Sequence, residues 1–158
     1  MSEVFEGVAV GMVATAPMTW TMWATDRLLP SHAQCHLPPR QITDELLDKA
    51  DLKDDLDRPQ RRALATAAHY AFGAAAGGLL AVAAKKVPLP KPLTGALVGS
   101  LVWASSYLGW LPALGIRRSA TEDYPARNAQ MFAAHLVWGA VAGALLDDVD
   151  NLTVDDRS

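Results

Sequence analysis

The predicted fold rests on one stretch of sequence, His135-Leu136-Val137-Trp138-Gly139-Ala140-Val141-Ala142-Gly143-Ala144-Leu145-Leu146. An earlier stretch nearly repeats it, His69-Tyr70-Ala71-Phe72-Gly73-Ala74-Ala75-Ala76-Gly77-Gly78-Leu79-Leu80. Residues 67–81 and 133–147, which include the two stretches, are identical at nine of fifteen positions. Neither stretch contains a charged side chain, and both place glycines four residues apart. This pattern predicts two helices that lie in lipid and derive from an internal duplication.

The charged residues are clustered along the chain. Hydrophobic residues make up 51% of the sequence and charged residues 20%, and four stretches are almost free of charge: 7–25, 63–84, 92–116 and 128–146. Each is about the 20 residues that a helix needs to cross ~30 Å of hydrocarbon, whereas a soluble bundle would turn charged residues toward water at every turn. We therefore predict an all-α polytopic membrane protein, a bundle of four transmembrane helices over about 4–24, 63–84, 92–114 and 128–146.

These helices are predicted to form two tandem hairpins in one domain, residues 1–146. The long connection, residues 25–62, contains Leu37-Pro38-Pro39-Arg40, which we expect to be extended because successive prolines disfavour a helix. It also contains a short surface helix over about 42–52, whose apolar residues recur at helical spacing. Residues 147–158 are acidic and predict a mobile tail.

Every predicted span carries its own Gly-x-x-x-Gly pair. In lipid, apolar area does not drive helices together, so close backbone approach at small residues does much of that work. The pairs predict packing seams within one bundle, and a homodimer seam on one of these faces is the alternative. The helix-packing glycines are Gly7, Gly11, Gly73, Gly77, Gly95, Gly99, Gly139 and Gly143.

The distribution of lysine and arginine predicts the orientation in the membrane. The connections 25–62 and 117–127 contain ten of these residues against four on the opposite side, so we expect both connections in the cytoplasm and both termini outside. The acidic start of the chain lacks the basic region of a signal peptide, so the first span is expected to be kept as an anchor. The expected partners are the lipid bilayer and a membrane protein or second copy. A net charge of −3 without a basic aromatic face argues against nucleic acid.

A candidate polar site lies within the predicted spans. His69 and His135 each lie six or seven residues inside a span that begins on the same side, about 9–11 Å into one leaflet at ~1.5 Å per residue. Glycines four and eight residues further along share their face, which directs both imidazoles into the bundle. Hydroxyl groups of other spans lie at comparable depth, and Trp20, Trp23 and Trp110 are expected to roof this layer. The candidate site residues are His69, His135, Thr15, Thr19, Ser105, Ser106 and Tyr107.

Three interpretations of the paired histidines stay open. Neutral imidazoles that donate to a hydroxyl or a free carbonyl would be interhelical glue. Histidine also titrates near neutral pH, so an imidazole inside a span indicates proton or small-solute handling. Two histidines at one depth could instead ligate a b-type haem in an electron carrier, although no arginine within the spans would meet its propionates. The leading prediction is a small membrane protein that acts as a scaffold or subunit or handles protons or solutes, and the haem carrier is the alternative.

The sequence shows no pattern of catalytic residues. It lacks a glycine-rich phosphate loop, a nucleophile elbow and a carboxylate pair within the spans, so an enzyme with its own chemistry is not expected. His32, Cys35 and His36 resemble metal ligands but lack the second ligand pair of a structural zinc site. We therefore expect a solvated loop there, with no metal and no resident cofactor.

Four stretches carry a family resemblance: Ala14-Thr15-Ala16-Pro17-Met18-Thr19, Leu37-Pro38-Pro39-Arg40, Ser106-Tyr107-Leu108-Gly109-Trp110-Leu111-Pro112 and His135-Leu136-Val137-Trp138-Gly139. Together they resemble the YagU-like group of small bacterial inner-membrane proteins of unknown function, over most of residues 5–146. The resemblance implies a polytopic inner-membrane protein and supplies no catalytic residues.

Overall fold

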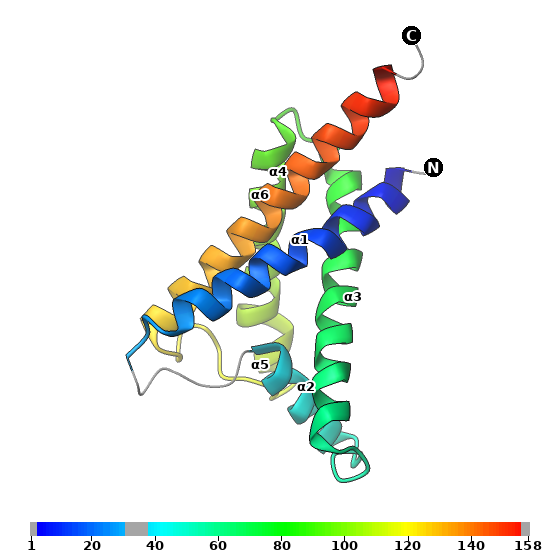
Figure 1. Ribbon diagram of the computed structural model, residues 1–158. Helices are drawn as coiled ribbons and strands as arrows, with labels where there is room; N and C mark the ends of the chain where they lie inside the picture. The colour runs from blue at the N-terminus through cyan, green and yellow to red at the C-terminus, as the bar shows by residue number, and fades with distance from the viewer. Residues whose placement is uncertain (1–2, 31–37, 156–158) are drawn as a thin grey trace.

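The computed structural model describes residues 3–30 and 38–155, which form helices, turns and loops without a β-strand. In chain order the elements are α1 (Glu3–Asp26), α2 (Pro38–Lys49), α3 (Arg58–Ala84), α4 (Lys91–Ala104), the π-helix η1 (Ser105–Trp110), α5 (Leu111–Ala113) and α6 (Pro125–Asp155). Figure 1 shows both chain ends and the turn between α3 and α4 at one end of the molecule, and α2 at the other. The predicted all-α fold is confirmed, and the long helices run back and forth between these two ends.

Two of the described helices, α3 and α6, are long and apolar enough to cross a membrane. On length and composition, the prediction of four spanning helices therefore holds for two. Helix α1 carries Pro17 and four threonines among its apolar residues. The third predicted span is divided because Gly109 takes φ −111° and ψ −105° inside η1, which interrupts the regular α-helix.

Helices α1 and α3 touch along their backbones at glycines. A Cβ atom added to Gly7 would lie 2.5 Å from the carbonyl oxygen of Gly77, and one added to Gly11 would lie 2.6 Å from the Gly77 Cα. On the α3 side, a Cβ atom on Gly73 would overlap the hydroxyl of Thr15. Side chains are therefore excluded at these positions, and main-chain contact holds the first hairpin together.

Helices α4 and α6 form the second hairpin in the same manner. A Cβ atom added to Gly95 would overlap the carbonyl oxygen of Gly139, and one added to Gly139 would overlap that of Gly95. The other glycine contacts of this seam are those of Gly99 with the His135 carbonyl and of Gly143 with the Lys91 carbonyl. Each hairpin therefore has a seam that admits no side chain larger than hydrogen.

The two hairpins differ in register. Gly7 and Gly95 occupy the same place in the repeat, as do Gly73 and Gly139. However, Gly95 packs on Gly139, whereas Gly7 packs on Gly77, four residues beyond the matching position. Four residues are about one helical turn, so the second hairpin is displaced by one turn relative to the first. The repeat in sequence is therefore not a strict repeat in space.

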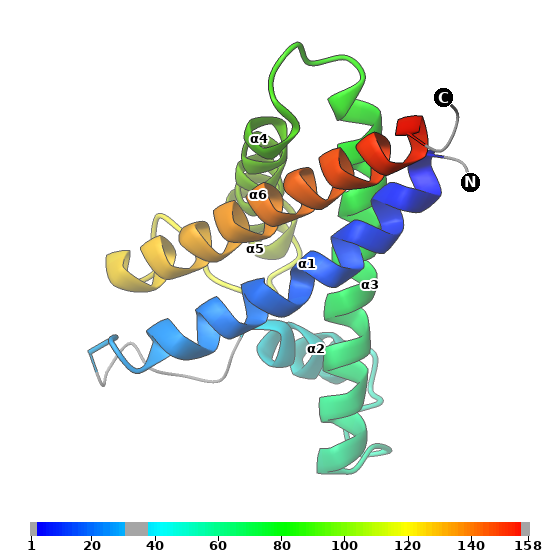
Figure 2. The same cartoon turned by 45° about the horizontal axis from the view of Figure 1, so that its top comes forward.

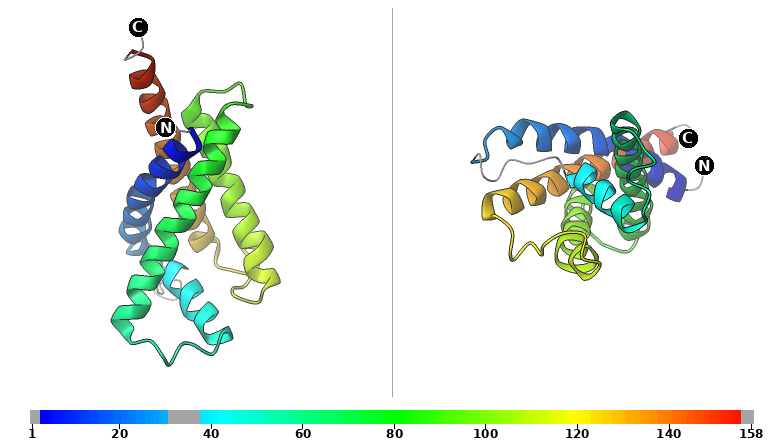
Figure 3. Two further views of the ribbon diagram at one scale, coloured as in Figure 1. Left: turned by 90° about the vertical axis from the view of Figure 1, so that its right-hand side faces the viewer. Right: turned by 90° about the horizontal axis from the view of Figure 1, so that it is seen from below.

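Helices α1 and α6 join the two hairpins and lie side by side in Figures 2 and 3. The Trp138 Nε1 donates a hydrogen bond to the carbonyl oxygen of Gly11 at 3.0 Å. The Gln130 amide nitrogen donates to the carbonyl oxygen of Met22 at 2.9 Å and to the Thr25 hydroxyl at 3.1 Å. These bonds link residues more than a hundred positions apart, so they fix how the hairpins meet.

Helix α2 begins earlier than the sequence predicts. Residues 38–40, expected to be extended, form its first turn, and the helix ends at Lys49 rather than near residue 52. Proline is tolerated in the first turn because the backbone N–H groups there have no acceptor within the helix. The prediction of an extended segment is therefore wrong from Pro38 onward, while Leu37 lies outside the described residues.

Helix α3 begins at Arg58, five residues before the predicted start at 63. The Asp57 carboxylate accepts a hydrogen bond from the Gln60 backbone N–H, and the Gln60 side-chain oxygen accepts one from the Asp57 backbone N–H, both at 2.8 Å. This capping box satisfies two amide groups that the helix itself leaves without partners. Charged residues therefore lie within the first turns of the helix, whereas the predicted span begins only after them.

Helix α6 continues past its predicted end at 146 and reaches Asp155. The acidic segment was expected to be a mobile tail, but two of its carboxylates face Lys91 at the start of α4. The Lys91 Nζ lies 3.1 Å from an oxygen of Asp147 and 2.7 Å from one of Asp150. Asp147 and Asp150 are one turn apart on α6, so a helical conformation presents both to one cation.

Exchange of Gly77 for alanine is expected to destabilise the protein, because the added methyl group would meet the backbones of Gly7 and Gly11. We expect a loss of about 1–3 kcal/mol, the usual cost of overpacking, seen as a lower midpoint of thermal unfolding in mild detergent. Gly78→Ala is the matched control, because its nearest contact is a Val8 methyl carbon at 3.3 Å that can move. Equal midpoints for the two variants would contradict the close α1–α3 seam.

Candidate functional site

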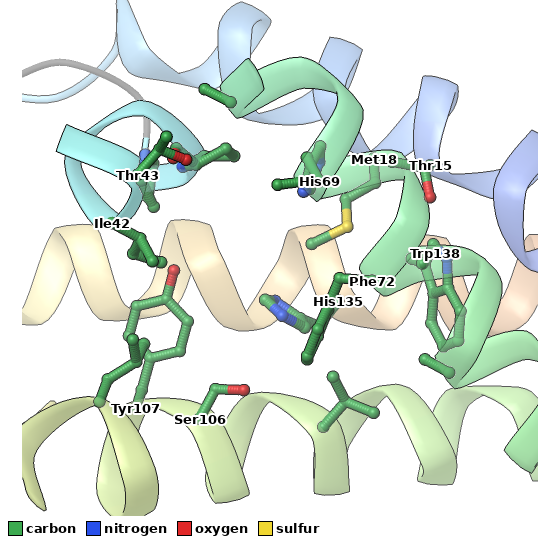
Figure 4. A pocket seen from close by; sticks show the side chains of 18 of the residues that line it. Thr15, Met18, Ile42, Thr43, His69, Phe72, Ser106, Tyr107, His135 and Trp138 are labelled. Atoms are coloured by element: carbon green, nitrogen blue, oxygen red, sulfur yellow. The ribbon is translucent and has the colours of Figure 1, made fainter. Parts of the chain in front are cut away.

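A half-enclosed cavity of about 230 Å³ lies between the helices, at the end of the molecule where α2 packs. Most of its wall is apolar, and the larger apolar side chains that line it include Met18, Met22, Phe72, Leu111 and Trp138. Polar groups reach it from several elements, namely Thr15, Thr43, His69, Ser106, Tyr107 and His135. Figure 4 shows the two imidazoles and the side chains of Ser106 and Tyr107 around one space. The cavity therefore combines an oily interior with a few convergent polar atoms.

The π-helix η1 supplies one wall of the cavity. Its wider turn places Ser106 and Tyr107 in the interior, whereas Ser105 is exposed and donates its hydroxyl proton back to the Val102 carbonyl at 3.1 Å. The Ser106 oxygen accepts a hydrogen bond from Trp110 Nε1 at 3.2 Å. Single π-turns are frequent at functional sites because they re-aim side chains within an otherwise regular helix.

His135 is held in a defined orientation on α6. It is 6% exposed, and its Nδ1 lies 2.7 Å from the carbonyl oxygen of Met131, one turn earlier. The His135 imidazole and the Tyr107 ring of η1 form an edge-to-face contact, with 5.9 Å between the ring centroids. One ring nitrogen of His135 is thus engaged by its own helix, and the other is left for the cavity.

His69 reaches the cavity from α3. Its Nε2 is buried and has no hydrogen-bond partner among the described residues. A buried polar atom without a partner costs about 1–3 kcal/mol. The hydrogen bond of His135 Nδ1 stays within α6, and His69 Nε2 has no partner among the described residues, so neither of these two nitrogens forms a hydrogen bond between helices. These hydrogen bonds therefore do not support the interpretation of the two histidines as interhelical glue.

Helix α2 covers the cavity with the side chains of Pro38, Ile42 and Thr43, among others. It is tied down from two directions. The Gln41 side-chain oxygen accepts hydrogen bonds from Arg117 at 2.7 Å and from Arg127 at 3.4 Å. On the other side, Asp44 lies 4.0 Å from Arg61 of α3. Helix α2 thus forms a lid on the site.

The structure brings together five of the seven predicted site residues. His69, His135, Thr15, Ser106 and Tyr107 all line the cavity. The remaining two are placed elsewhere: Thr19 donates its hydroxyl proton to the Thr15 carbonyl at 2.8 Å, and Ser105 is exposed. Successive residues of a helix point about 100° apart, so three neighbours such as 105–107 cannot all face one cavity.

The expected tryptophan roof is wrong for two of its three members. Trp20 is 66% exposed and Trp23 is 52% exposed, and neither lines the cavity, whereas Trp110 does. Trp23 instead packs its ring under the guanidinium of Arg27, with 4.2 Å from the central carbon to the ring centroid. The roof is α2, because that helix lies over the opening between the hairpins.

Phe72 and Trp138 are cavity residues that the sequence reasoning did not select. The signal was present in the repeat, because each follows its histidine by three residues. Residues three apart share a helix face, so an aromatic ring is placed beside each imidazole. The thioether of Met18 was not selected either, since a methionine within an apolar helix carries no distinguishing pattern.

The described residues contain no group of three or more histidine, cysteine, aspartate or glutamate side chains that could hold a metal ion. His32, Cys35 and His36, considered above as ligands, lie outside the described residues. The cavity also does not suit a haem. Its volume is below the ~300–1,000 Å³ of cavities that hold drug-sized ligands, and no arginine or lysine is among its described lining residues.

Comparison with known proteins finds no matching family model, no matching curated protein and no matching solved structure. The resemblance to the YagU-like group therefore stays a prediction.

Exchange of each histidine for phenylalanine is expected to have opposite effects on stability. His69→Phe removes a buried nitrogen without a partner, so the free energy of unfolding should stay equal or rise by up to about 1 kcal/mol. His135→Phe removes the hydrogen bond to Met131 and should cost about 0.5–1.5 kcal/mol. Unfolding midpoints in the same detergent measure both changes. A loss from His69→Phe as large as that from His135→Phe would mean that the His69 nitrogen has a partner after all.

Proposed function

We propose that this chain is an integral protein of the bacterial inner membrane with four spans, and that its cavity binds a small, mostly apolar molecule. The observation that carries the membrane part is the distribution of side-chain size. Many large apolar side chains are exposed on the outside of the helices, and glycine and alanine fill the seams between them, while larger side chains such as Met22, Leu80 and Trp138 are buried in the remaining interior. A water-soluble bundle shows the opposite arrangement, because its large apolar side chains form the core.

The outer face of α4 and η1 illustrates this distribution. Its leucines recur along one side and are 48–68% exposed: Leu93, Leu97, Leu101 and Leu108. The interior positions Ala14, Ala134 and Ala142 are by contrast completely buried. Contiguous exposed apolar surface of this kind marks contact with lipid or with another protein, and its presence on α1, α3 and α4 favours lipid.

The polar groups of α1 are compatible with a lipid environment. The hydroxyls of Thr15, Thr19, Thr21 and Thr25 each donate a hydrogen bond to the carbonyl four residues earlier, at 2.9, 2.8, 2.9 and 2.6 Å. A hydroxyl satisfied within its own helix leaves no open donor toward hydrocarbon. The third span runs from Lys91 to Ala113 through α4, η1 and α5, with a kink at Gly109. These features support four spans rather than two.

The arrangement of the ends supports the proposed orientation. The described parts of the connections 25–62 and 117–127 lie at the end that carries α2 (Figure 1), and the two connections hold most of the lysine and arginine of the sequence. The positive-inside rule places this end in the cytoplasm, with both termini outside. In this orientation α2 closes the cavity from the cytoplasmic side.

The cavity is the reason for proposing a ligand rather than a purely structural role. Tight packing is the rule in protein interiors, so a cavity of about 230 Å³ between packed helices is a feature that a purely structural role does not require. Its apolar wall suits a molecule that partitions into the bilayer, and its few polar atoms suit recognition of one functional group. Small-solute handling is therefore the function that the site supports best.

The membrane part is tested by topology mapping in a Cys35→Ser background with one new cysteine at a time. The protein should stay in the membrane pellet after an alkaline carbonate wash. An impermeant maleimide should label Lys86→Cys in intact spheroplasts, and Asp54→Cys only after lysis, because the α3–α4 turn and the α2–α3 turn that carry them lie at opposite ends of the molecule (Figure 1). Release by carbonate would overturn membrane insertion, and reversed labelling would overturn only the orientation.

The ligand part is tested with propylbenzene as a neutral apolar probe in lipid nanodiscs. At about 100 times its Kd, it should stabilise the protein by about 2.7 kcal/mol, seen as a higher unfolding temperature. Ala65→Leu, which places a larger side chain in the lining, should abolish the shift. Ala75→Leu is the control, because Ala75 is exposed on the same helix and outside the lining. Equal shifts in the two variants would show that the probe acts through the lipid.

A further inference from the structure

We infer that the ligand of the cavity is a neutral alcohol or phenol with a compact apolar body, whose hydroxyl group donates a hydrogen bond to Nε2 of His135. This inference rests on the proposed function, since it names the chemical class bound at the same site.

The hydrogen bond within α6 fixes which nitrogen of His135 carries the proton. Its Nδ1 lies 2.7 Å from the Met131 carbonyl oxygen, and a peptide carbonyl can only accept. The proton is therefore assigned to Nδ1, and in the neutral ring Nε2 has a lone pair and no hydrogen. A ligand group that meets Nε2 must donate, so a ketone, an ether or an ester oxygen would face repulsion there.

The composition of the wall indicates that the ligand is uncharged. Among the described lining residues there is no aspartate, glutamate, lysine or arginine. A charged ligand would lose its hydration without gaining a partner of opposite charge, which is strongly unfavourable in an apolar site. The same lack of a carboxylate leaves no counter-charge for an imidazolium, so the neutral form of His135 is the one that the cavity favours.

A second nitrogen increases the preference for a polar head on the ligand. Nε2 of His69 is buried without a partner among the described residues and belongs to the same lining. Figure 4 shows the His69 and His135 rings on opposite sides of the Met18 side chain in that view. A hydroxyl that donates to His135 keeps its oxygen lone pairs for a further polar contact, which no purely apolar ligand offers.

The volume and the aromatic wall limit the apolar body. A cavity of about 150 Å³ accommodates a benzene ring, so about 230 Å³ leaves room for a ring and a few further heavy atoms. Phe72, Trp110 and Trp138 line the space, and aromatic side chains pack well against another ring. A substituted phenol is therefore the probe that the geometry fits best.

The test compares para-propylphenol with para-propylanisole, in which a methyl group replaces the hydroxyl hydrogen, and with propylbenzene. Binding to the full-length protein in lipid nanodiscs is measured by tryptophan fluorescence, with empty nanodiscs as the correction for partitioning. We expect the phenol to bind about three- to tenfold more tightly than either analogue, the effect of one hydrogen bond to an acceptor that is otherwise unmatched. Equal affinities, or tighter binding of the anisole, would overturn the inference.

Two variants identify the acceptor. In His135→Phe the phenol and its two analogues should bind with about equal affinity. In Tyr107→Phe the phenol should still bind more tightly, although the Tyr107 side chain lines the same cavity. Loss of the preference in Tyr107→Phe alone would overturn the assignment to His135. If His135→Phe does not fold, the three-probe comparison on the unaltered protein still decides the ligand class. Failure of all three probes to bind would refute the proposed function itself, whereas equal binding refutes only the hydroxyl preference.

Discussion

Direct contact between main chains at glycine is the constraint on which the rest of this structure depends. Gly7 and Gly77 in one hairpin, and Gly95 and Gly139 in the other, bring two helices so close that even a methyl group would overlap a carbonyl. Close approach brings many backbone atoms into van der Waals contact, which is the attraction that remains available between helices in lipid. Large side chains are displaced from these seams, and they occupy the outer surface, the cavity wall and the rest of the core.

The two seams were readable in the sequence because glycine at four-residue spacing has a direct physical meaning. The sequence did not predict which residues pack against each other, nor the one-turn displacement between the two hairpins. Which glycine faces which depends on how two helices slide along each other, and a Gly-x-x-x-Gly pair is compatible with several registers that differ by a turn. The predicted boundaries of α3 and α6 were wrong for a different reason. Charge was taken as the end of a helix, but Asp57 caps one helix and Asp147 anchors the other to Lys91.

The candidate site was predictable in part. His69 and His135 follow from the repeat, because each precedes its glycine pair by one turn on the same face. The sequence predicted Ser106 and Tyr107 only together with Ser105. No sequence pattern indicates the local change of helix type at η1 that separates them. The lid was the least predictable element. Helix α2 is short, and its position over the cavity depends on side chains such as Gln41 and Arg117 that are distant in sequence.

Trp138 belongs to two parts of the molecule at once. Its ring lines the cavity, and its indole nitrogen bonds Gly11 across the junction between the hairpins. Any occupant that shifts this ring alters the bond, and any movement of α1 against α6 alters the shape offered to the occupant. By thermodynamic reciprocity, occupancy and the separation of the two halves must then influence each other to the same extent. A single indole therefore links the shape of the cavity to the packing of the two hairpins.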